Sequence, residues 1–294
     1  MARFGAVLTA MVTPFTADGE LDGARAAELA RWLVDRGNDG LVLAGTTGES
    51  PVLTDEERTE LFRVVREAVD VPLVAGSTTN DTAHSVAMTQ AAHELGMDGI
   101  LAVTPYYNRP SQAGLEAHFR AVASASPLPV LLYDIPIRTG RKISTELMVR
   151  LAEDVPTITG VKDAAQNPAE TARLVSLAPD DFEVYSGDDS MTLPFLAVGA
   201  VGLIGVATHW CAAEAGEMIA AFAKGDVERA RELNQRLLPS WAYETSDATP
   251  NPLPSKVMLE LLGQPVGECR LPMGPPPPSL ADEARTVAQG LGLL

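Results

Sequence analysis

The chain contains little of what would place it outside the cytoplasm or attach it to a membrane. Its 294 residues include only two cysteines, Cys211 and Cys269, which are too few for a disulfide framework. The longest apolar run, 193–207, is short and is interrupted by Pro194 and several glycines, so it does not predict a membrane span. The first residues run directly into an apolar strand pattern, without a cleavable signal. These absences predict a soluble cytoplasmic protein.

Basic residues are also scarce relative to acidic ones. Lys and Arg number 22 against 39 Asp and Glu, which gives a formal net charge of -17. The acids are spread through helix-like segments, as expected for a solvated, self-repelling surface. Neither nucleic acid nor an anionic membrane is therefore an expected partner. A site for an anionic substrate would need positive groups of its own.

Three common kinds of site are missing from the sequence. The four histidines show no metal-ligand spacing, and His209 with Cys211 would supply only two ligands, so no metal is expected. There is no Gly-x-Ser-x-Gly nucleophile elbow. The turn after the first apolar strand, Thr13-Pro14-Phe15-Thr16, lacks the glycines of a dinucleotide-binding fold.

What the chain does contain is a regular alternation of short apolar runs with amphipathic segments. The apolar runs do not alternate with polar residues, as expected for strands that are buried on both faces. Strands are predicted at 6–13, 40–44, 72–75, 99–104, 130–133, 158–162, 182–186 and 202–206. Helices are predicted at 23–36, 55–69, 82–95, 112–125, 145–152, 168–177 and 191–198. Eight such repeats predict an α/β fold of the (β/α)8 TIM-barrel type rather than an open doubly wound sheet.

Helical patterns continue beyond the eighth strand. They cover about 212–224, 226–241 and 255–262, and a last helix follows the proline-rich spacer 275–278. We expect residues 1–224 to form the catalytic barrel domain and residues 225–294 to form a helical C-terminal region packed on the barrel.

Lys162 is the most informative candidate residue. Active sites of (β/α)8 barrels lie at the C-terminal ends of the strands, and Lys162 ends the sixth one. An ammonium group above the barrel core would be partly desolvated, which lowers a lysine pKa and exposes the amine as a nucleophile toward carbonyls. A lysine that extends from a strand end to solvent is the alternative, and it is the commoner case for a single residue.

Other strand ends supply groups that favour the catalytic interpretation. Tyr133 ends the fifth strand and can transfer protons, while Thr46 and Thr47 offer two hydroxyl groups in a glycine-bounded turn that suits a carboxylate. Arg138 follows a proline-fixed turn and offers a bidentate fork for a second carboxylate. Tyr107 adds a second phenol after the fourth strand. Packing alone does not require this combination of groups.

Five motifs in order resemble the dihydrodipicolinate synthase (4-hydroxy-tetrahydrodipicolinate synthase) family of pyruvate-dependent Schiff-base lyases and aldolases. They are Gly-Thr-Thr-Gly-Glu-Ser, Thr-Pro-Tyr-Tyr-Asn-Arg-Pro, Tyr-Asp-Ile-Pro-Ile-Arg-Thr-Gly, Gly-Val-Lys-Asp-Ala and Ser-Gly-Asp-Asp. The resemblance extends from about residue 8 to residue 273. The Tyr-Asp-Ile-Pro form, where many relatives have Tyr-Asn-Val-Pro, is similar to actinobacterial members.

The resemblance implies a condensation of pyruvate with L-aspartate-4-semialdehyde to 4-hydroxy-tetrahydrodipicolinate, the first committed step toward diaminopimelate and lysine. Lys162 would form the imine with pyruvate, with no cofactor and no metal. The remaining roles implied are a proton relay of Tyr133, Thr46 and Tyr107, and substrate contacts from Thr47, Arg138, Gly187 and Ile204. In this family the tyrosine matching Tyr107 enters a neighbouring subunit, which implies a tight dimer and usually a homotetramer built as a dimer of dimers.

Within those contacts, Thr47 would hold the pyruvate carboxylate, and Gly187 and Ile204 would line the pocket. Arg138 would bind the carboxylate of the semialdehyde. A sibling lyase acting on a sugar keto acid, of the N-acetylneuraminate or 2-keto-3-deoxygluconate type, is disfavoured by Arg138 and Tyr107. A non-catalytic pyruvate-binding relative is disfavoured because no relay residue is missing.

The sequence departs from lysine-inhibited members of the family at the effector site. Asn80 and Tyr106 match that site, but its two histidines are replaced by Asp55 and Arg58, and its acidic residue by His84. A neutral or positive group at the last position would bind an ammonium poorly. We therefore expect weak or absent inhibition by L-lysine.

Overall fold

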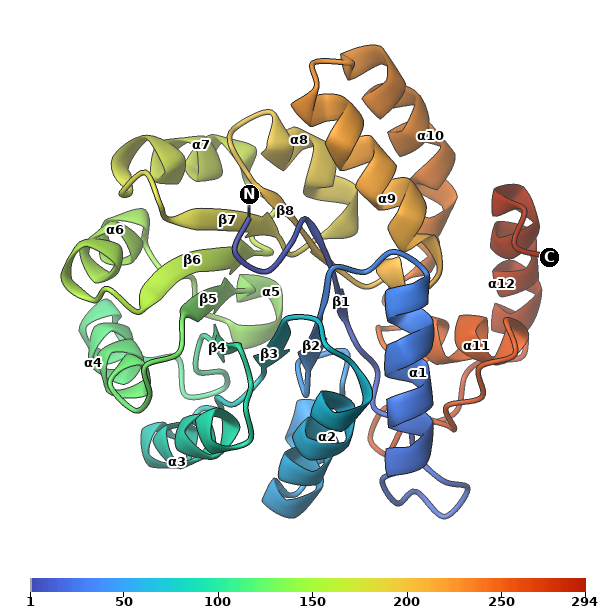
Figure 1. Ribbon diagram of the computed structural model, residues 1–294, viewed down its shortest axis with the longest axis horizontal. Helices are drawn as coiled ribbons and strands as arrows, with labels where there is room; N and C mark the ends of the chain where they lie inside the picture. The colour runs from blue at the N-terminus through green and yellow to red at the C-terminus, as the bar shows by residue number, and fades with distance from the viewer. Residues whose placement is uncertain (1) are drawn as a thin grey trace. The chain divides into compact units, whose positions relative to one another are not determined.

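The computed structural model describes residues 2–294 and contains a closed parallel barrel of eight strands (Figure 1). The strand order around the barrel is β1 to β8. The strands are β1 (Val7–Ala10), β2 (Gly40–Leu43), β3 (Leu73–Ala75), β4 (Gly99–Val103), β5 (Val130–Asp134), β6 (Ile158–Asp163), β7 (Glu183–Ser186) and β8 (Gly202–Gly205). Helices separate successive strands and continue after β8. The predicted (β/α)8 barrel with C-terminal helices is confirmed.

The chain divides into two compact units, and neither of them is one continuous segment. Unit 1 comprises the residues up to Ala6 together with Pro72–Ile204, and unit 2 comprises Val7–Val71 together with Gly205–Leu294. Unit 1 thus contains β3 to β7 and most of β8, whereas unit 2 contains β1, β2 and the C-terminal helices.

Helices and strands alternate through unit 1, and in Figure 1 the longer helices lie outside its strands. The helices are α3 (Thr82–Glu94), α4 (Gln112–Ala123), α5 (Pro136–Thr139), α6 (Thr145–Asp154), α7 (Pro168–Leu177) and α8 (Thr192–Leu196), with a 3-10 turn at Asp189–Met191. The side chains of Ser111, Ser144 and Asn167 accept a backbone N–H at the starts of α4, α6 and α7. Each such cap satisfies a donor that the first helical turn leaves open.

Close strand packing in unit 1 depends on two glycines. A Cβ atom on Gly160 of β6 would lie 2.3 Å from the Glu183 carbonyl oxygen of β7. A Cβ atom on Gly202 of β8 would lie 2.3 Å from the Ala6 carbonyl oxygen. Since no real side chain fits at that distance, only glycine allows the backbones to approach so closely.

Unit 2 carries the helices at both ends of the chain. They are α1 (Gly23–Asp35), α2 (Asp55–Ala68), α9 (Thr208–Ala223), α10 (Val227–Tyr243), α11 (Leu253–Leu261) and α12 (Leu280–Leu291), with a 3-10 turn at Ser50–Val52. Thr54 and Glu57 form a complete capping box at the start of α2. Helix α9 begins four residues before the predicted position of 212 and bends at Cys211, whose φ is -130°.

The first strand is shorter than predicted, and its surroundings explain why. The prediction covered residues 6–13, but β1 ends at Ala10. Beyond that point the backbone N–H of Val12 donates to Nε2 of His209, and the hydroxyl of Thr13 donates to the Gly48 carbonyl. At Val12 and Thr13, hydrogen bonds that involve side chains thus replace the backbone hydrogen bonds of the strand.

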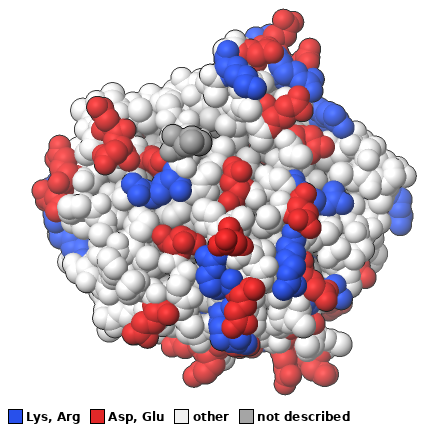
Figure 2. Space-filling model, viewed as in Figure 1, with Lys and Arg blue, Asp and Glu red and all other residues white. Residues whose placement is uncertain are grey.

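Acidic and basic side chains are interspersed on the face drawn in Figure 2. On α2, Arg63 forms ion pairs with Glu60 and Glu67. On α4, Glu116 accepts from Arg120 and from Arg150 of α6. Within residues 2–294, no helix is both long enough and apolar enough to cross a bilayer.

Candidate active site

Lys162 and Tyr133 lie side by side at the C-terminal ends of neighbouring strands in unit 1. They are register partners between β6 and β5, and the Lys162 Nζ atom lies 4.5 Å from the centre of the Tyr133 ring. Only 4% of Lys162 is exposed. The lysine therefore does not extend freely into solvent, which was the alternative that the sequence left open. A buried primary amine beside a phenol can attack a carbonyl and exchange protons with its neighbour.

Gly187 leaves room along the Lys162 side chain. A Cβ atom at Gly187 would lie 2.9 Å from Cγ and 3.1 Å from Cε of Lys162. The Gly187 backbone N–H donates to the carbonyl of Asp163 at 2.7 Å, which fixes this glycine against the end of β6. Ile204, the other predicted lining residue, is fully buried in β8.

Two buried carboxylates follow directly after the lysine and the tyrosine in the sequence. Asp134 forms a 2.8 Å ion pair with Lys142 Nζ and accepts a 3.0 Å hydrogen bond from the Ile143 N–H. Asp163 accepts from the Thr171 hydroxyl at 2.8 Å. Burial raises the pKa of Asp134, and the nearby Lys142 ammonium opposes that rise. Our sequence reasoning missed both carboxylates, although an acid at the end of an apolar strand was a usable signal.

Arg138 lies on α5, a single turn that the sequence did not predict as a helix. The turn is closed at its base by Asp134, whose side chain holds Lys142 and Ile143. Inside it, the Thr139 hydroxyl donates to the Ile135 carbonyl at 3.1 Å. Arg138 itself is exposed. A guanidinium presented on a braced turn is suited to an incoming carboxylate.

Tyr107 is the most exposed large hydrophobic side chain among the described residues, at 91%. Its φ of 70° is left-handed, a strained conformation for a residue with a Cβ atom. The next residue, Asn108, donates from Nδ2 to the Asn80 carbonyl at 2.9 Å and so ties the loop down. Within unit 1 the phenol of Tyr107 therefore projects away from the chain's own core.

Thr46 and Thr47 lie in unit 2, in the loop that follows β2. Thr46 is half-buried and Thr47 is buried. The Thr47 Oγ1 atom accepts a 2.9 Å hydrogen bond from Nδ2 of Asn251, which comes from the connection between α10 and α11. Asn251 was not among our sequence candidates, because nothing in the sequence links residues 204 positions apart.

Glu49 connects the same loop to the C-terminal part of unit 2. It forms a 2.8 Å ion pair with Lys256 of α11, and both side chains are almost fully buried. Its second oxygen accepts from the backbone N–H of Arg270 at 2.9 Å. The ring of Phe15 lies under both cations, 4.3 Å from Lys256 Nζ and 4.2 Å from the Arg270 guanidinium carbon. The Arg270 guanidinium also pairs with Glu57 and holds the pKa of that carboxyl below its ordinary value.

Two of the positions that the resemblance matches to an effector site make local contacts. Arg58 is buried and donates from its guanidinium to the Ser50 carbonyl at 3.1 Å. The His84 Nδ1 atom lies 3.3 Å from the Thr79 hydroxyl. Over residues 2–294, no group of three or more His, Cys, Asp or Glu side chains is placed to hold a metal ion.

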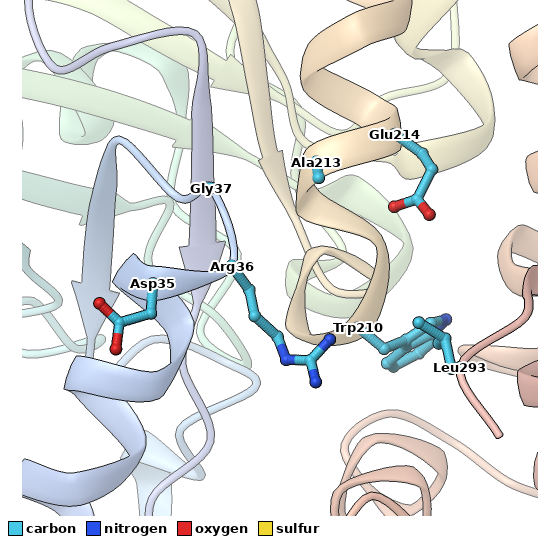
Figure 3. Close-up of a pocket in the computed structure, with 7 residues that line it drawn as sticks. All are labelled: Asp35, Arg36, Gly37, Trp210, Ala213, Glu214 and Leu293. Carbon is cyan, nitrogen blue, oxygen red and sulfur yellow. The ribbon is translucent and has the colours of Figure 1, made fainter.

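A separate pocket of about 400 Å³ lies in unit 2 and contains none of the candidate residues. Figure 3 shows its lining, which is Asp35, Arg36, Gly37, Trp210, Ala213, Glu214 and Leu293. Two of these side chains have partners of their own: Arg36 stacks over Trp32 at 4.4 Å, and the Trp210 indole donates to Ser240. We assign no binding role to this pocket.

A closed parallel barrel with polar groups at the carboxyl ends of its strands defines the class of (β/α)8-barrel enzymes. Residues 3–289 match the dihydrodipicolinate synthetase family, and the chain belongs to that family. The family predicted from the sequence motifs is thereby confirmed.

Individual relatives agree with this assignment over nearly the whole chain. The 4-hydroxy-tetrahydrodipicolinate synthase of Acidothermus cellulolyticus is 53% identical and covers 92% of this chain and 87% of its own. The enzyme of the same name from Moorella thermoacetica is 49% identical and covers 92% of each chain. The crystal structure of dihydrodipicolinate synthase from Cyanidioschyzon merolae with lysine bound is 42% identical, has a TM-score of 0.97 and covers 100% of both chains.

Proposed function

We propose that the chain is a lyase that condenses pyruvate with L-aspartate-4-semialdehyde and yields 4-hydroxy-tetrahydrodipicolinate. The names of the curated relatives support this activity. The structural observation that carries it is the buried Lys162 beside Tyr133, at the end of a barrel where such enzymes do their chemistry. Pyruvate held on Lys162 takes the place of a cofactor, so none is required.

The reaction follows from the chemistry of an imine. The Lys162 amine attacks the keto carbon of pyruvate, and loss of water leaves an imine that withdraws electrons. A proton then leaves the methyl carbon, and the resulting enamine attacks the aldehyde carbon of the second substrate. The amino group of the semialdehyde finally adds to the imine carbon, which closes the ring and releases Lys162.

Each remaining candidate has a role in this scheme. Tyr133, with Thr46 and Tyr107, moves protons to and from the developing hydroxyl groups. Thr47 holds the pyruvate carboxylate, while Gly187 and Ile204 line the space around it. Arg138 binds the carboxylate of the semialdehyde, which a sugar keto acid would not bring to that position.

We propose further that the active form is an oligomer in the cytoplasm, a homotetramer built from tight dimers. Tyr107 and Ile137 support this, because 91% and 85% of their surface is exposed on the described chain. Large apolar side chains that are this exposed mark surfaces that bind another protein chain. A structurally similar variant, 36% identical with a TM-score of 0.93, is described as monomeric. Sedimentation of this chain should give the mass of a tetramer, and the mass of a monomer would contradict the proposal. We also propose residues 1–224 as the catalytic domain and 225–294 as a helical region packed on it.

Borohydride trapping tests the central claim. Incubation with pyruvate and borohydride should add a reduced pyruvate adduct to the peptide that contains Lys162, and Lys162→Ala should abolish it. Lys224→Ala is the control, because Lys224 is an exposed lysine at the end of α9, and this variant should keep the label. A coupled assay with the semialdehyde then separates this activity from cleavage of a sugar keto acid. No label on Lys162, or turnover of only the sugar acid, would contradict the proposal.

A further inference from the structure

The C-terminal part of unit 2 contacts a predicted substrate-binding residue directly. The Nδ2 atom of Asn251 donates to Oγ1 of Thr47 over 2.9 Å. Both side chains are more than nine-tenths buried, at 6% and 2% exposed. The contact is therefore shielded from water, which would otherwise compete for both groups.

Asn251 is itself held in place by the turn that precedes it. Its backbone N–H donates to the Thr245 hydroxyl at 3.2 Å. Within the turn, the Ser246 hydroxyl accepts from the Thr249 N–H at 2.9 Å, and the two hydroxyls lie 2.8 Å apart. On the far side, the Tyr243 hydroxyl donates to the Pro254 carbonyl at 3.0 Å. The amide is thus presented to Thr47 from a braced segment.

The direction of this bond decides what Thr47 can offer a ligand. A threonine hydroxyl has one proton and two lone pairs. Because Asn251 donates to one lone pair, the hydroxyl proton must point to another acceptor. An anion is such an acceptor, and a hydroxyl that donates to a carboxylate forms a charge-assisted hydrogen bond. A hydroxyl whose proton pointed to Asn251 would instead turn its lone pairs toward the anion.

We propose that Asn251 is a positioning residue that aims the Thr47 hydroxyl proton at the substrate carboxylate and so sets the affinity for pyruvate. This inference rests on the proposed function, in which Thr47 binds that carboxylate. Lys256 and Arg270 also anchor the loop, but they act on Glu49 and not on the hydroxyl. Loss of the Lys256 or Arg270 contact should therefore lower the stability of the protein, whereas loss of the Asn251 contact should lower its affinity for pyruvate.

Steady-state kinetics of Asn251 variants test the proposal. Asn251→Ala should raise the apparent KM for pyruvate about tenfold, equivalent to about 1.4 kcal/mol, with little change in the KM for the semialdehyde. Asn251→Asp should raise it further, since an ionised carboxylate can only accept from Thr47. Asn234→Ala is the matched control, because Asn234 lies in α10 and its side chain accepts from the Trp241 indole. That control should leave both KM values unchanged.

A double-mutant cycle shows whether the effect passes through Thr47. On a Thr47→Val background, Asn251→Ala should no longer change the KM for pyruvate. Additive effects would overturn the proposal, and so would an Asn251→Asp enzyme with unchanged pyruvate affinity. Borohydride trapping at saturating pyruvate should remain complete in the variants. Loss of trapping at every pyruvate concentration would point to a general structural role and equally overturn it. If the unmodified enzyme is not labelled at all, it is the proposed function that fails.

Discussion

Removal of the Lys256 ammonium should strongly destabilise the protein. Lys256 and Glu49 pair at 2.8 Å with side chains only 4% and 2% exposed, so neither charge has water as a substitute partner. In Lys256→Met the side chain still covers Phe15, but the buried Glu49 carboxylate loses the ammonium with which it is paired and keeps the hydrogen bond from the Arg270 N–H. An uncompensated buried charge of this kind costs about 3–5 kcal/mol. The melting temperature should fall by on the order of 10 °C.

Urea unfolding followed by circular dichroism measures this cost. The matched control is Arg229→Met, which breaks the Arg229–Glu217 pair, whose side chains are 44% and 54% exposed. That change should leave the urea midpoint of unfolding nearly unchanged, because exposed ion pairs contribute little to the free energy of unfolding. A Glu49→Gln, Lys256→Met double variant should be more stable than Lys256→Met alone, since it no longer buries a charge. If Lys256→Met were as harmless as the control, the ion pair would not be what secures this loop.

Three further predictions concern substrate choice, pH and regulation. Arg138→Ala should weaken semialdehyde binding by on the order of 2–3 kcal/mol, read as a higher KM, and equal effects on both substrates would contradict its role. Burial lowers the pKa of His209 from 6.5 to about 4. Between these two pH values the His209 imidazole is therefore neutral in the folded protein and protonated in the unfolded chain. The contribution of His209 to the free energy of unfolding should therefore fall by about 3 kcal/mol between pH 6.5 and 4, and His209→Gln should reduce the pH dependence of stability by that amount in urea titrations. With Asp55, Arg58 and His84 at the effector positions, L-lysine should not inhibit at sub-millimolar concentrations; an enzyme assay that shows such inhibition would refute this.

The elements that could be predicted from the sequence are those whose signal is local. The eight apolar runs predicted the barrel because strands buried on both faces leave a continuous apolar trace. Errors occurred where a distant partner decides the outcome, as at β1, where His209 takes the Val12 N–H. Helix α5 was missed because four residues are too few to show a helical period.

The same distinction applies to the site. Lys162 and Tyr133 could be paired in advance because consecutive parallel strands bring their ends together. Asn251 could not, since its contact with Thr47 joins positions 204 residues apart and leaves no pattern in either segment. Asp134 was visible as part of a motif, but its ion pair with Lys142 depends on how the intervening turn closes.

The contacts of Glu49 with Lys256 and Arg270, in the C-terminal part of unit 2, have a consequence for how the protein is made. The Arg270 N–H that donates to Glu49 lies 221 residues further along the chain. At ordinary rates of translation, the ribosome takes about 10 to 45 s to cover that distance. For most of this interval the nascent Glu49 loop has neither Lys256 nor Arg270 as a partner, so the loop that carries Thr46 and Thr47 should reach its final form only near the end of synthesis.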